Sequence, residues 1–360
     1  MKLKSVGLRN FTVFRDSLFE LAPGLNVFIG ENGTGKSHLL KVIYALSEAV
    51  RRSHTGEPLV WGRRLGLNGL VHDLLQGVFQ PESLASFSTN PQEVTSISLV
   101  WSDGRGEKVE LDVELHPRAD GLIAEVRGPV AKLDRAIFVP PREVLSIFPG
   151  FIAAWQKRES GFDSTYFDLC TALALRPLRD GGPRELIEPL EREIQGRVVL
   201  KSDQFYVVSN GTSREAAMVG DGDRKLAMIA HLLMNGSLAG GSCLLWDEPE
   251  ANLNPKRANL ASGMMVALAH HGMQILAATH DYALTSEIAL QVDTDETAAG
   301  GVAFFSLRRD AGASSILVER GDRLAELSHN AMLDALAGLH DREMLANDVK
   351  DVRAIAQGED

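Results

Sequence analysis

A glycine-rich stretch near the N-terminus constrains the fold of this chain more than any other part of its sequence. The apolar run Leu25–Ile29 predicts a buried strand, and the apolar spacing that begins at Leu39 predicts an amphipathic helix. Between them, residues 30–37 match the pattern G-x-x-x-x-G-K-[ST] at every fixed position. In this context the backbone N–H groups of the loop and the N-terminus of the helix face an anion. The stretch therefore predicts a site for a nucleoside triphosphate.

The chemistry of the loop residues predicts their roles. Lys36 is expected to reach the β- and γ-phosphates, and the Ser37 hydroxyl is expected to hold Mg²⁺. The expected nucleotide-binding residues are Gly30, Glu31, Asn32, Gly33, Thr34, Gly35, Lys36, Ser37 and His38.

Two later apolar strands are expected to end at the same site. The first is followed by Asp247 and Glu248. Because successive strand residues point to opposite sides, we expect Asp247 to hold the metal and Glu248 to polarise the attacking water. The second begins at Gln274 and ends at His280, which we expect to contact the γ-phosphate. The predicted catalytic residues are Lys36, Glu248 and His280.

Composition limits the class of protein. The 360 residues are 44% hydrophobic and 24% charged, which is ordinary for a globular protein with a full core. Cys170 and Cys243 are far apart and lack metal-ligand spacing, so we expect buried, reduced thiols. The sequence has neither a signal-peptide pattern nor a run of 18 apolar residues, so we expect a cytoplasmic protein without a membrane span. A net charge of −11 gives no basic footprint for nucleic acid, which is neither predicted nor excluded.

The remaining patterns predict an α/β fold with an insertion. Successive strand patterns at 94–101, 107–115, 122–127 and 133–139 predict an antiparallel sheet beside the nucleotide core. Helical spacing in Val144–Phe148, Phe167–Leu173 and Leu186–Ile194 predicts an inserted helical lid. A hairpin is expected at 197–208 and a second, at the sheet edge, at 302–319.

This pattern predicts four parts of the chain. They are an N-terminal lobe with the glycine loop and the antiparallel sheet (1–142), the helical lid (143–196), a C-terminal lobe (197–325) and a helical tail (326–360).

Taken together, the motifs resemble those of the ABC-type ATPases. The glycine loop, the sequence D-E-P-E with a following N-L-N-P, and the strand-end T-H look closest to the soluble RecF/OLD/SMC-like branch. Segments 140–151, 162–169, 219–233 and 246–256 look like a bacterial group of short AAA-type ATPases, whose members often sit beside partner genes in anti-phage or toxin–antitoxin contexts. The resemblance implies an ABC-type ATPase head, with a mixed central sheet flanked by helices, an antiparallel β subdomain and an inserted helical lid.

The resemblance also implies residues that act across a dimer. The family signature, normally L-S-G-G-Q, matches residues 219–223 just before a helix and would touch the γ-phosphate of the opposite protomer. Gly220 stands where the family has its serine, which leaves the turnover rate open. The implied signature residues are Gly220, Asp221, Gly222 and Asp223, and the implied D-loop residues are Asn252 and Asn254.

Five further residues are each left with two interpretations. Arg9 and Asn10 either contact the base or ribose or simply end a strand. Arg142 is a phosphate or inter-subunit contact, or a surface ion pair. The Q-loop glutamine is either Gln76 or Gln80.

Two functions follow from the resemblance. The leading one is an Mg-dependent ATPase that dimerises around two ATP molecules and drives a conformational change in a partner, in a context such as anti-phage defence. The alternative is an ATP-gated scaffold with little turnover that holds a separate effector, a nuclease or a toxin. Gly220 favours the scaffold, whereas Glu248 and His280 favour hydrolysis.

Overall fold

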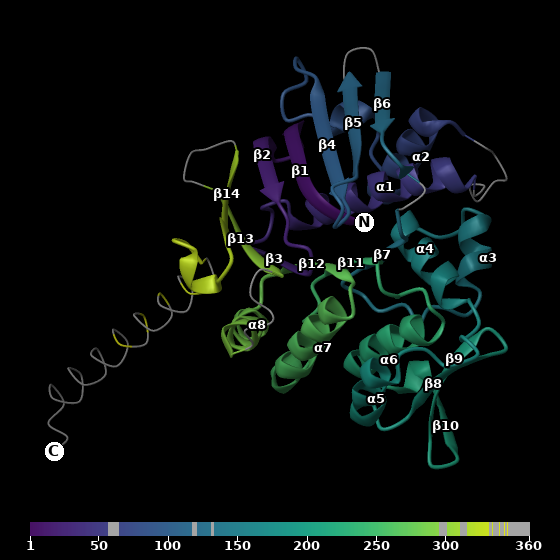
Figure 1. The fold of residues 1–360 in the computed structure, drawn as a ribbon. Helices are drawn as coiled ribbons and strands as arrows, with labels where there is room; N and C mark the ends of the chain where they lie inside the picture. The colour runs from purple at the N-terminus through teal and green to yellow at the C-terminus, as the bar shows by residue number, and fades with distance from the viewer. Residues whose placement is uncertain are drawn as a thin grey trace, which may run out of the picture.

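The chain is described by a computed structural model. It covers residues 1–56, 65–116, 121–130, 133–294, 301–309 and 315–330, with isolated positions at 333, 338, 342 and 344. In Figure 1 an antiparallel sheet lies above a central sheet, and helices α5 to α8 cover the opposite face of the central sheet. The predicted helical tail falls almost wholly outside the described residues.

The central sheet confirms the predicted α/β core. Six described strands form it in the order β14-β13-β3-β12-β11-β7, and all neighbours pair in parallel except the edge strand β14. The strands are β3 (Leu25–Gly30), β7 (Ala136–Val139), β11 (Cys243–Asp247), β12 (Gln274–Thr279), β13 (Val302–Arg309) and β14 (Ile316–Gly321). Thr279 pairs with Ile29, and Asp247 pairs with Ala278. This register places the carboxyl ends of β3, β12 and β11 side by side.

Each face of the central sheet packs into its own hydrophobic core. Val27 and Ile29 point into the core shared with α4 to α8, whereas Phe28 points into the core shared with α1 (Lys36–Thr55). This alternation follows from the two-residue period of a strand. Every residue of β3 is buried, so helices or sheets must cover both faces.

The antiparallel sheet is confirmed, with one correction. Five described strands form it in the order β2-β1-β4-β5-β6. They are β1 (Lys2–Phe11), β2 (Phe14–Glu20), β4 (Thr95–Ser102), β5 (Lys108–His116) and β6 (Gly121–Arg127). The strand expected at 133–139 was wrongly placed in this sheet, because β7 pairs in parallel with β11. All four residues of β7 are buried, which suits a strand covered on both faces.

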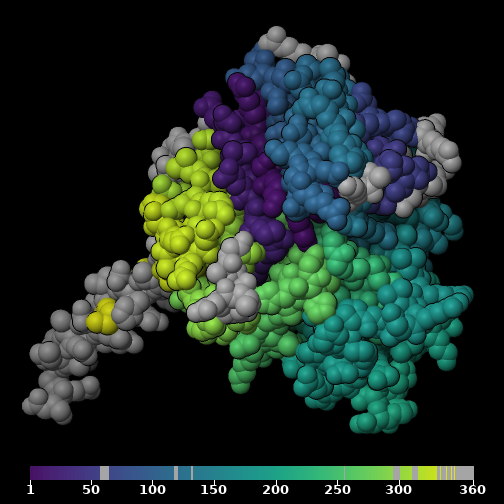
Figure 2. Space-filling model, in the orientation of Figure 1, coloured from purple at the N-terminus to yellow at the C-terminus, as the bar shows by residue number. Residues whose placement is uncertain are grey.

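The two sheets enclose α1 and meet at a common edge. Helix α2 (Leu67–Phe79) packs on α1 and β6. The expected hairpin at 302–319 is present, but only β14 lies at the edge, because β13 pairs with β3. In Figure 2 the yellow surface of this hairpin lies beside the purple surface of the N-terminal strands, where β14 contacts β2.

The predicted lid is largely helical. Its side chains pack into the core that Val27 and Ile29 also enter. Its helices are α3 (Phe151–Gln156), α4 (Ser164–Leu173) and α5 (Arg184–Glu193). They lead into a three-stranded sheet of β8 (Arg197–Lys201), β9 (Gln204–Ser209) and β10 (Thr212–Glu215). The remaining helices are α6 (Asp221–Met234), α7 (Ala258–His270) and α8 (Tyr282–Thr294). None of the helices within the described ranges is both long and apolar enough to cross a membrane.

The helix expected at Val144–Phe148 is wrong. These residues form turns, and Glu143 accepts hydrogen bonds from the backbone N–H and the hydroxyl of Ser146. A side chain that bonds nearby backbone groups in this way stabilises a turn instead of a helix. The four-part division of the chain stays a prediction, because the lid packs into the same core as the C-terminal lobe.

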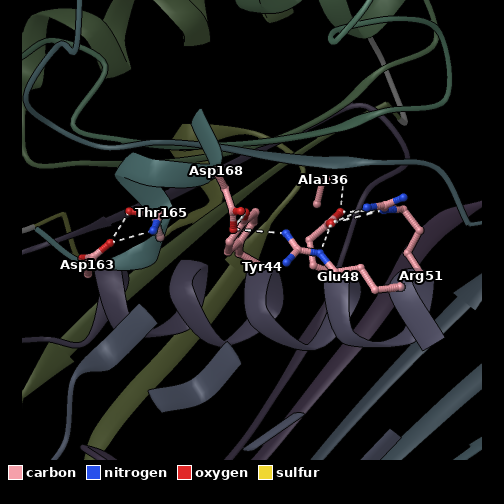
Figure 3. Close-up of polar contacts among 8 residues, drawn as sticks. Tyr44, Glu48, Arg51, Ala136, Asp163, Thr165 and Asp168 are labelled. Carbon is pink, nitrogen blue, oxygen red and sulfur yellow. Dashed lines mark hydrogen bonds and ion pairs between the residues drawn. The ribbon is translucent and has the colours of Figure 1, made fainter. Parts of the chain in front are cut away.

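A polar seam joins α1 to the lid helix α4 (Figure 3). Lys41 Nζ lies 2.7 Å from Asp163 Oδ2, and Asp163 also caps the N-terminus of α4. One turn further along α1, the Tyr44 hydroxyl donates to Asp168 Oδ2 at 2.7 Å, and Arg52 pairs with the same carboxylate at 3.1 Å. The helix that follows the glycine loop is therefore attached to the lid by charge-assisted bonds.

The seam continues into a buried carboxylate. Glu48 is 1% exposed and pairs with Arg51 and Arg52, and it accepts the backbone N–H of Ala136 at 3.0 Å. Burial alone would raise the pKa of Glu48, but the hydrogen bond from Arg51 and the charge of Arg52 hold it below its usual value. A buried charge persists only when it is paired in this way.

Removing the central carboxylate of the seam should destabilise the fold. In Asp168→Ala, the buried Tyr44 hydroxyl and Arg52 lose a partner, and we expect the free energy of unfolding to fall by about 3 kcal/mol. Urea denaturation measures this loss. The control Asp16→Ala, at an exposed position of β2, should change stability by less than about 0.5 kcal/mol. Equal losses in both variants would contradict the role of the seam.

Candidate functional site

The loop after β3 has the geometry expected of a phosphate-binding turn. Gly33 and Gly35 have φ angles of +79° and +89°, which favour glycine. A Cβ atom at Gly35 would lie 2.5 Å from Val13 Cγ2 and 2.8 Å from the Phe14 ring, whereas one at Gly33 would meet open space. Gly35 is therefore required both by its backbone conformation and by close packing against residues 13–14.

Lys36 lies over its own loop. Its side chain is 8% exposed, and Nζ donates to the carbonyl oxygens of Gly30 at 2.6 Å and of Glu31 at 2.8 Å. Thr34 Oγ1 also donates to Glu31 O at 2.8 Å. Burial lowers the pKa of Lys36, while the charges of Asp247 and Glu248 oppose that shift.

Asp247, at the end of β11, lies next to the start of α1. It is 4% exposed, and its carboxylate is hydrogen-bonded to the Ser37 hydroxyl. Burial raises the pKa of Asp247 to about 6, and the Ser37 hydrogen bond opposes the rise. A hydroxyl and a carboxylate are hard oxygen donors that suit Mg²⁺. No group of three or more His, Cys, Asp or Glu side chains in the described ranges could hold a metal ion by itself.

Glu248 turns away from Asp247 and toward the end of β12. Its φ angle is +49°, and its side chain is 34% exposed. His280 Nδ1 lies 3.6 Å from Glu248 Oε1 and also 3.6 Å from Glu250 Oε1. The carboxylates of two neighbouring acids thus flank one imidazole ring at the strand ends.

Three site residues were missed by sequence reasoning. Glu250 Oε1 accepts from Thr279 Oγ1 at 2.8 Å and from the His280 backbone N–H at 3.1 Å, and burial raises the pKa of Glu250. Arg309, from β13, donates to Gly33 O at 3.3 Å. Lys225, from α6, donates to Glu248 O. Glu250, the last acid of D-E-P-E, and the basic pair 308–309 were visible in the sequence, but their contacts are long-range.

The signature-like segment is the first turn of α6 and not a loop before it. The helix begins at Asp221, with Gly220 as its N-cap. Asp221 pairs with Arg224, and Asp223 pairs with Arg257. These ion pairs explain how two acids are accommodated at this helix end.

The predicted D-loop lies against that turn. A Cβ atom at Gly222 would lie 3.0 Å from Asn252 O, so the two segments pack closely. Asn252 is exposed with φ +64°, and the exposed Asn254 accepts the backbone N–H of Lys256. The signature-like turn and the predicted D-loop are therefore packed against each other.

The other candidate residues differ in their burial and in their contacts. Asn10 is buried, and its side chain bonds the backbone of Asn90 and Glu93, which favours the strand-end interpretation. Arg9 is exposed on β1. His38, in the first turn of α1, has its ring 5.7 Å from that of Phe79. The side chains of Glu31 and Asn32 are exposed at the loop.

The remaining candidates lie near the lid. The Arg142 guanidinium lies 5.7 Å from the ring centroid of Phe162, which is a cation–π contact. Its predicted role at a phosphate or between subunits stays a prediction. Gln76 and Gln80 both line a cleft of about 420 Å³ between α2 and the lid helices. Gln80 Nε2 also donates to Phe162 O at 3.2 Å. Both glutamines stay predicted Q-loop candidates.

Curated relatives match only a short part of the chain. The RecF DNA replication and repair protein of Lactococcus lactis subsp. cremoris strain SK11 is 39% identical over 74 residues, which are 20% of this chain and 21% of that protein. RecF of Chlamydia caviae is 36% identical over 64 residues, 17% of each chain. The matches span about a fifth of the length of these relatives.

Solved structures match nearly the whole fold at low identity. An SMC head bound to the C-winged helix domain of ScpA gives a TM-score of 0.55 at 12% identity, covering 89% of this chain and 98% of that chain. A Pyrococcus furiosus Smc head with an extended coiled coil, bound to the C-terminal domain of ScpA, gives 0.53 at 9% identity, covering 95% and 99%. These similarities concern the fold alone.

One family model spans the site from its glycine loop to the helix after His280. The family described as "AAA domain, putative AbiEii toxin, Type IV TA system" matches residues 25–286. This range includes β3, the acids that follow β11 and the end of β12. The chain belongs to this AAA family. The short RecF matches and the SMC-head-like fold support an ABC-type P-loop ATPase of the RecF/SMC-like kind.

Proposed function

We propose that this chain binds Mg-ATP and hydrolyses it to ADP and phosphate. The observation that carries the proposal is the register of three adjacent parallel strands, which brings Lys36, Asp247 and His280 to one end of the sheet. The family to which the chain belongs supports an ATPase activity. Because the reaction uses ATP, we place the protein in the cytoplasm.

Charge and position would supply the catalysis. The Lys36 ammonium donates hydrogen bonds to two loop carbonyls. It would donate to the β- and γ-phosphates instead when these enter the loop. Ser37 and Asp247 would hold Mg²⁺, which supplies charge neutralisation to the phosphates when bound. Glu248 would accept or orient a proton of the attacking water. His280, flanked by Glu248 and Glu250, would contact the γ-phosphate.

We further propose that two copies close around two ATP molecules. The exposed N-cap of α6, at Gly220, leaves backbone N–H groups available to a partner's γ-phosphate. Arg224 and Arg257 neutralise the acids of this turn, so that Asp221 and Asp223 oppose an incoming phosphate less strongly. Asn252 and Asn254 lie on the same surface and would face the partner.

The output of the cycle would be a change in a separate partner protein. The matched family is described as a putative AbiEii toxin of a type IV toxin–antitoxin system, and the two SMC heads of similar fold are bound to domains of ScpA. A role in anti-phage defence fits this context. The net charge of −11 gives nucleic acid no support as the target.

An ATP-gated scaffold is the second candidate, and Gly220 favours it. A serine hydroxyl that would contact the phosphate is absent at this position. Such a scaffold would bind ATP and dimerise but release little phosphate. Phosphate release by the wild-type protein distinguishes the two functions.

The first test removes the proposed base. Glu248→Gln should bind Mg-ATP as the wild type does, while the rate of phosphate release falls by about 10²-fold or more, because the amide cannot accept a proton. A phosphate-release assay and a titration with a fluorescent ATP analogue measure the two effects. If the wild type itself releases no phosphate, the chain is the scaffold and not the enzyme.

A matched glycine pair tests the phosphate loop. Gly33→Ala introduces only the strain of a left-handed residue, about 1 kcal/mol, whereas Gly35→Ala adds overlap with Val13 and Phe14, about 1–3 kcal/mol. We therefore expect Gly33→Ala to retain weakened ATP binding and Gly35→Ala to lose it, as calorimetry would measure. Equal binding by the two variants would contradict the geometry of the loop.

The dimer is tested by the mass in solution. Light scattering should show a doubling of mass with Mg-ATP, and the dimer should persist longer in Glu248→Gln, which holds its ATP. The control Lys36→Ala, which lacks the phosphate contact, should remain a monomer. A constant mass for all three proteins with ATP bound to the wild type would exclude the proposed closure.

A further inference from the structure

A buried lysine joins the signature-like turn to the proposed catalytic turn. Lys225 lies in α6 and is only 1% exposed. Its Nζ donates to the carbonyl oxygens of Glu248 and Ala251, both at 2.9 Å. Burial lowers the pKa of Lys225 to about 8, while the charge of Glu250 opposes the shift. An ammonium is strongly hydrated, so its burial against two neutral carbonyls needs an explanation.

The turn that Lys225 contacts has an unusual backbone. Glu248 has a φ angle of +49°, in the left-handed region that residues with a side chain rarely adopt. Its backbone N–H donates to Ala278 O at 2.9 Å, and its carbonyl accepts the backbone N–H of Ala251 at 3.0 Å. Strained conformations of this kind persist only where the surroundings hold them. Lys225 stabilises this conformation, because its ammonium donates to carbonyl oxygens at both ends of the turn.

The consequence of this conformation is the direction of the Glu248 side chain. With the left-handed φ, the carboxylate lies 3.6 Å from His280 while Asp247 stays buried beside Ser37. A change of backbone at this residue would redirect the carboxylate without touching the loop that holds Lys36. Hydrolysis would then be affected separately from ATP binding.

The position of Lys225 in its helix adds a second consequence. Asp221, Gly222 and Asp223 form the first turn of α6, and Lys225 follows in the next. A small shift of this helix would therefore move the ammonium relative to both carbonyls of the 248–251 turn. Since that helix start is the surface proposed to meet the second protomer, contact there would be transmitted to Glu248 of the same chain.

We propose that Lys225 is a positioning residue for hydrolysis: its ammonium holds the 248–251 turn in the conformation that aims Glu248 at His280 and ties that turn to the start of α6. The inference rests on the proposed ATPase function. The neighbouring Arg224 has a different task, because it pairs with Glu143 and Asp221.

The test is a double-mutant cycle between Lys225 and Glu248. Lys225→Met keeps the length of the side chain and removes the donors. We expect its affinity for a fluorescent ATP analogue to stay at the wild-type value while kcat falls on the order of 10²-fold. The control Lys201→Met, at an exposed position of β8, should change neither quantity.

The cycle separates a positioning role from a general loss of structure. If Lys225 acts through Glu248, the variant Lys225→Met/Glu248→Gln should hydrolyse ATP no more slowly than Glu248→Gln alone in single-turnover measurements. Losses that multiply in the double variant would overturn the inference. So would a wild-type kcat for Lys225→Met, or a loss of ATP affinity that equals the loss of kcat.

A second variant is used if Lys225→Met does not fold. Thermal unfolding is measured for each protein, and if Lys225→Met does not fold, Lys225→Arg replaces it in the same cycle, because the guanidinium keeps the charge but shifts the donors. A reduced kcat with unchanged affinity then supports the inference, and multiplicative losses overturn it. A wild type without phosphate release would overturn the proposed function and this inference together, whereas an active wild type beside an equally active Lys225→Met overturns the inference alone.

Discussion

The site depends on the hydrogen-bonded register between β3, β12 and β11. Thr279 lies opposite Ile29, and Asp247 lies opposite Ala278, so three strands end within one row of residues. A slip of one residue would turn every buried side chain of a strand to the other face, and both faces here are filled. The two hydrophobic cores therefore fix the register, and the register brings Asp247 to Ser37 and His280 to Glu248.

Local sequence patterns predicted the parts of the fold that are locally determined. The glycine loop, its flanking strand and helix, and the runs before Asp247 and His280 were predicted, because a short segment contains their whole pattern. The strand at 136–139 was assigned to the wrong sheet, since its four apolar residues do not say which neighbour it pairs with. The turns at 144–148 were predicted as a helix, because the apolar spacing does not reveal that Glu143 bonds Ser146. The roles predicted for single residues stay predictions.

The missed contacts share a physical cause. Glu250 contacts the end of a strand 29 residues further along the chain, and Lys225 contacts the backbone carbonyls of a distant turn. A carbonyl acceptor has no signature in the sequence, because every residue has one. Lysine is usually exposed, so its position in a mostly apolar helix was the one available indication of a buried donor. Contacts of this type become visible only when the topology is known.

Two sets of contacts hold the turn after β11 from opposite sides. The Glu250 side chain attaches it to Thr279 and the start of the next segment, and Lys225 attaches it to α6. Both groups are buried, and burial shifts the pKa of each toward its neutral form. The charge of Glu250 opposes the shift in the pKa of Lys225, and the hydrogen bonds from Thr279 and His280 oppose the shift in the pKa of Glu250, so neither shift is as large as burial alone would cause. Both contacts are made by buried charged groups, the Glu250 carboxylate and the Lys225 ammonium. Removing one group would therefore leave the charge of the other less well neutralised. The turn that carries Glu248 is thus coupled to β12 and to α6 at once, and a movement of either element would be felt at the carboxylate.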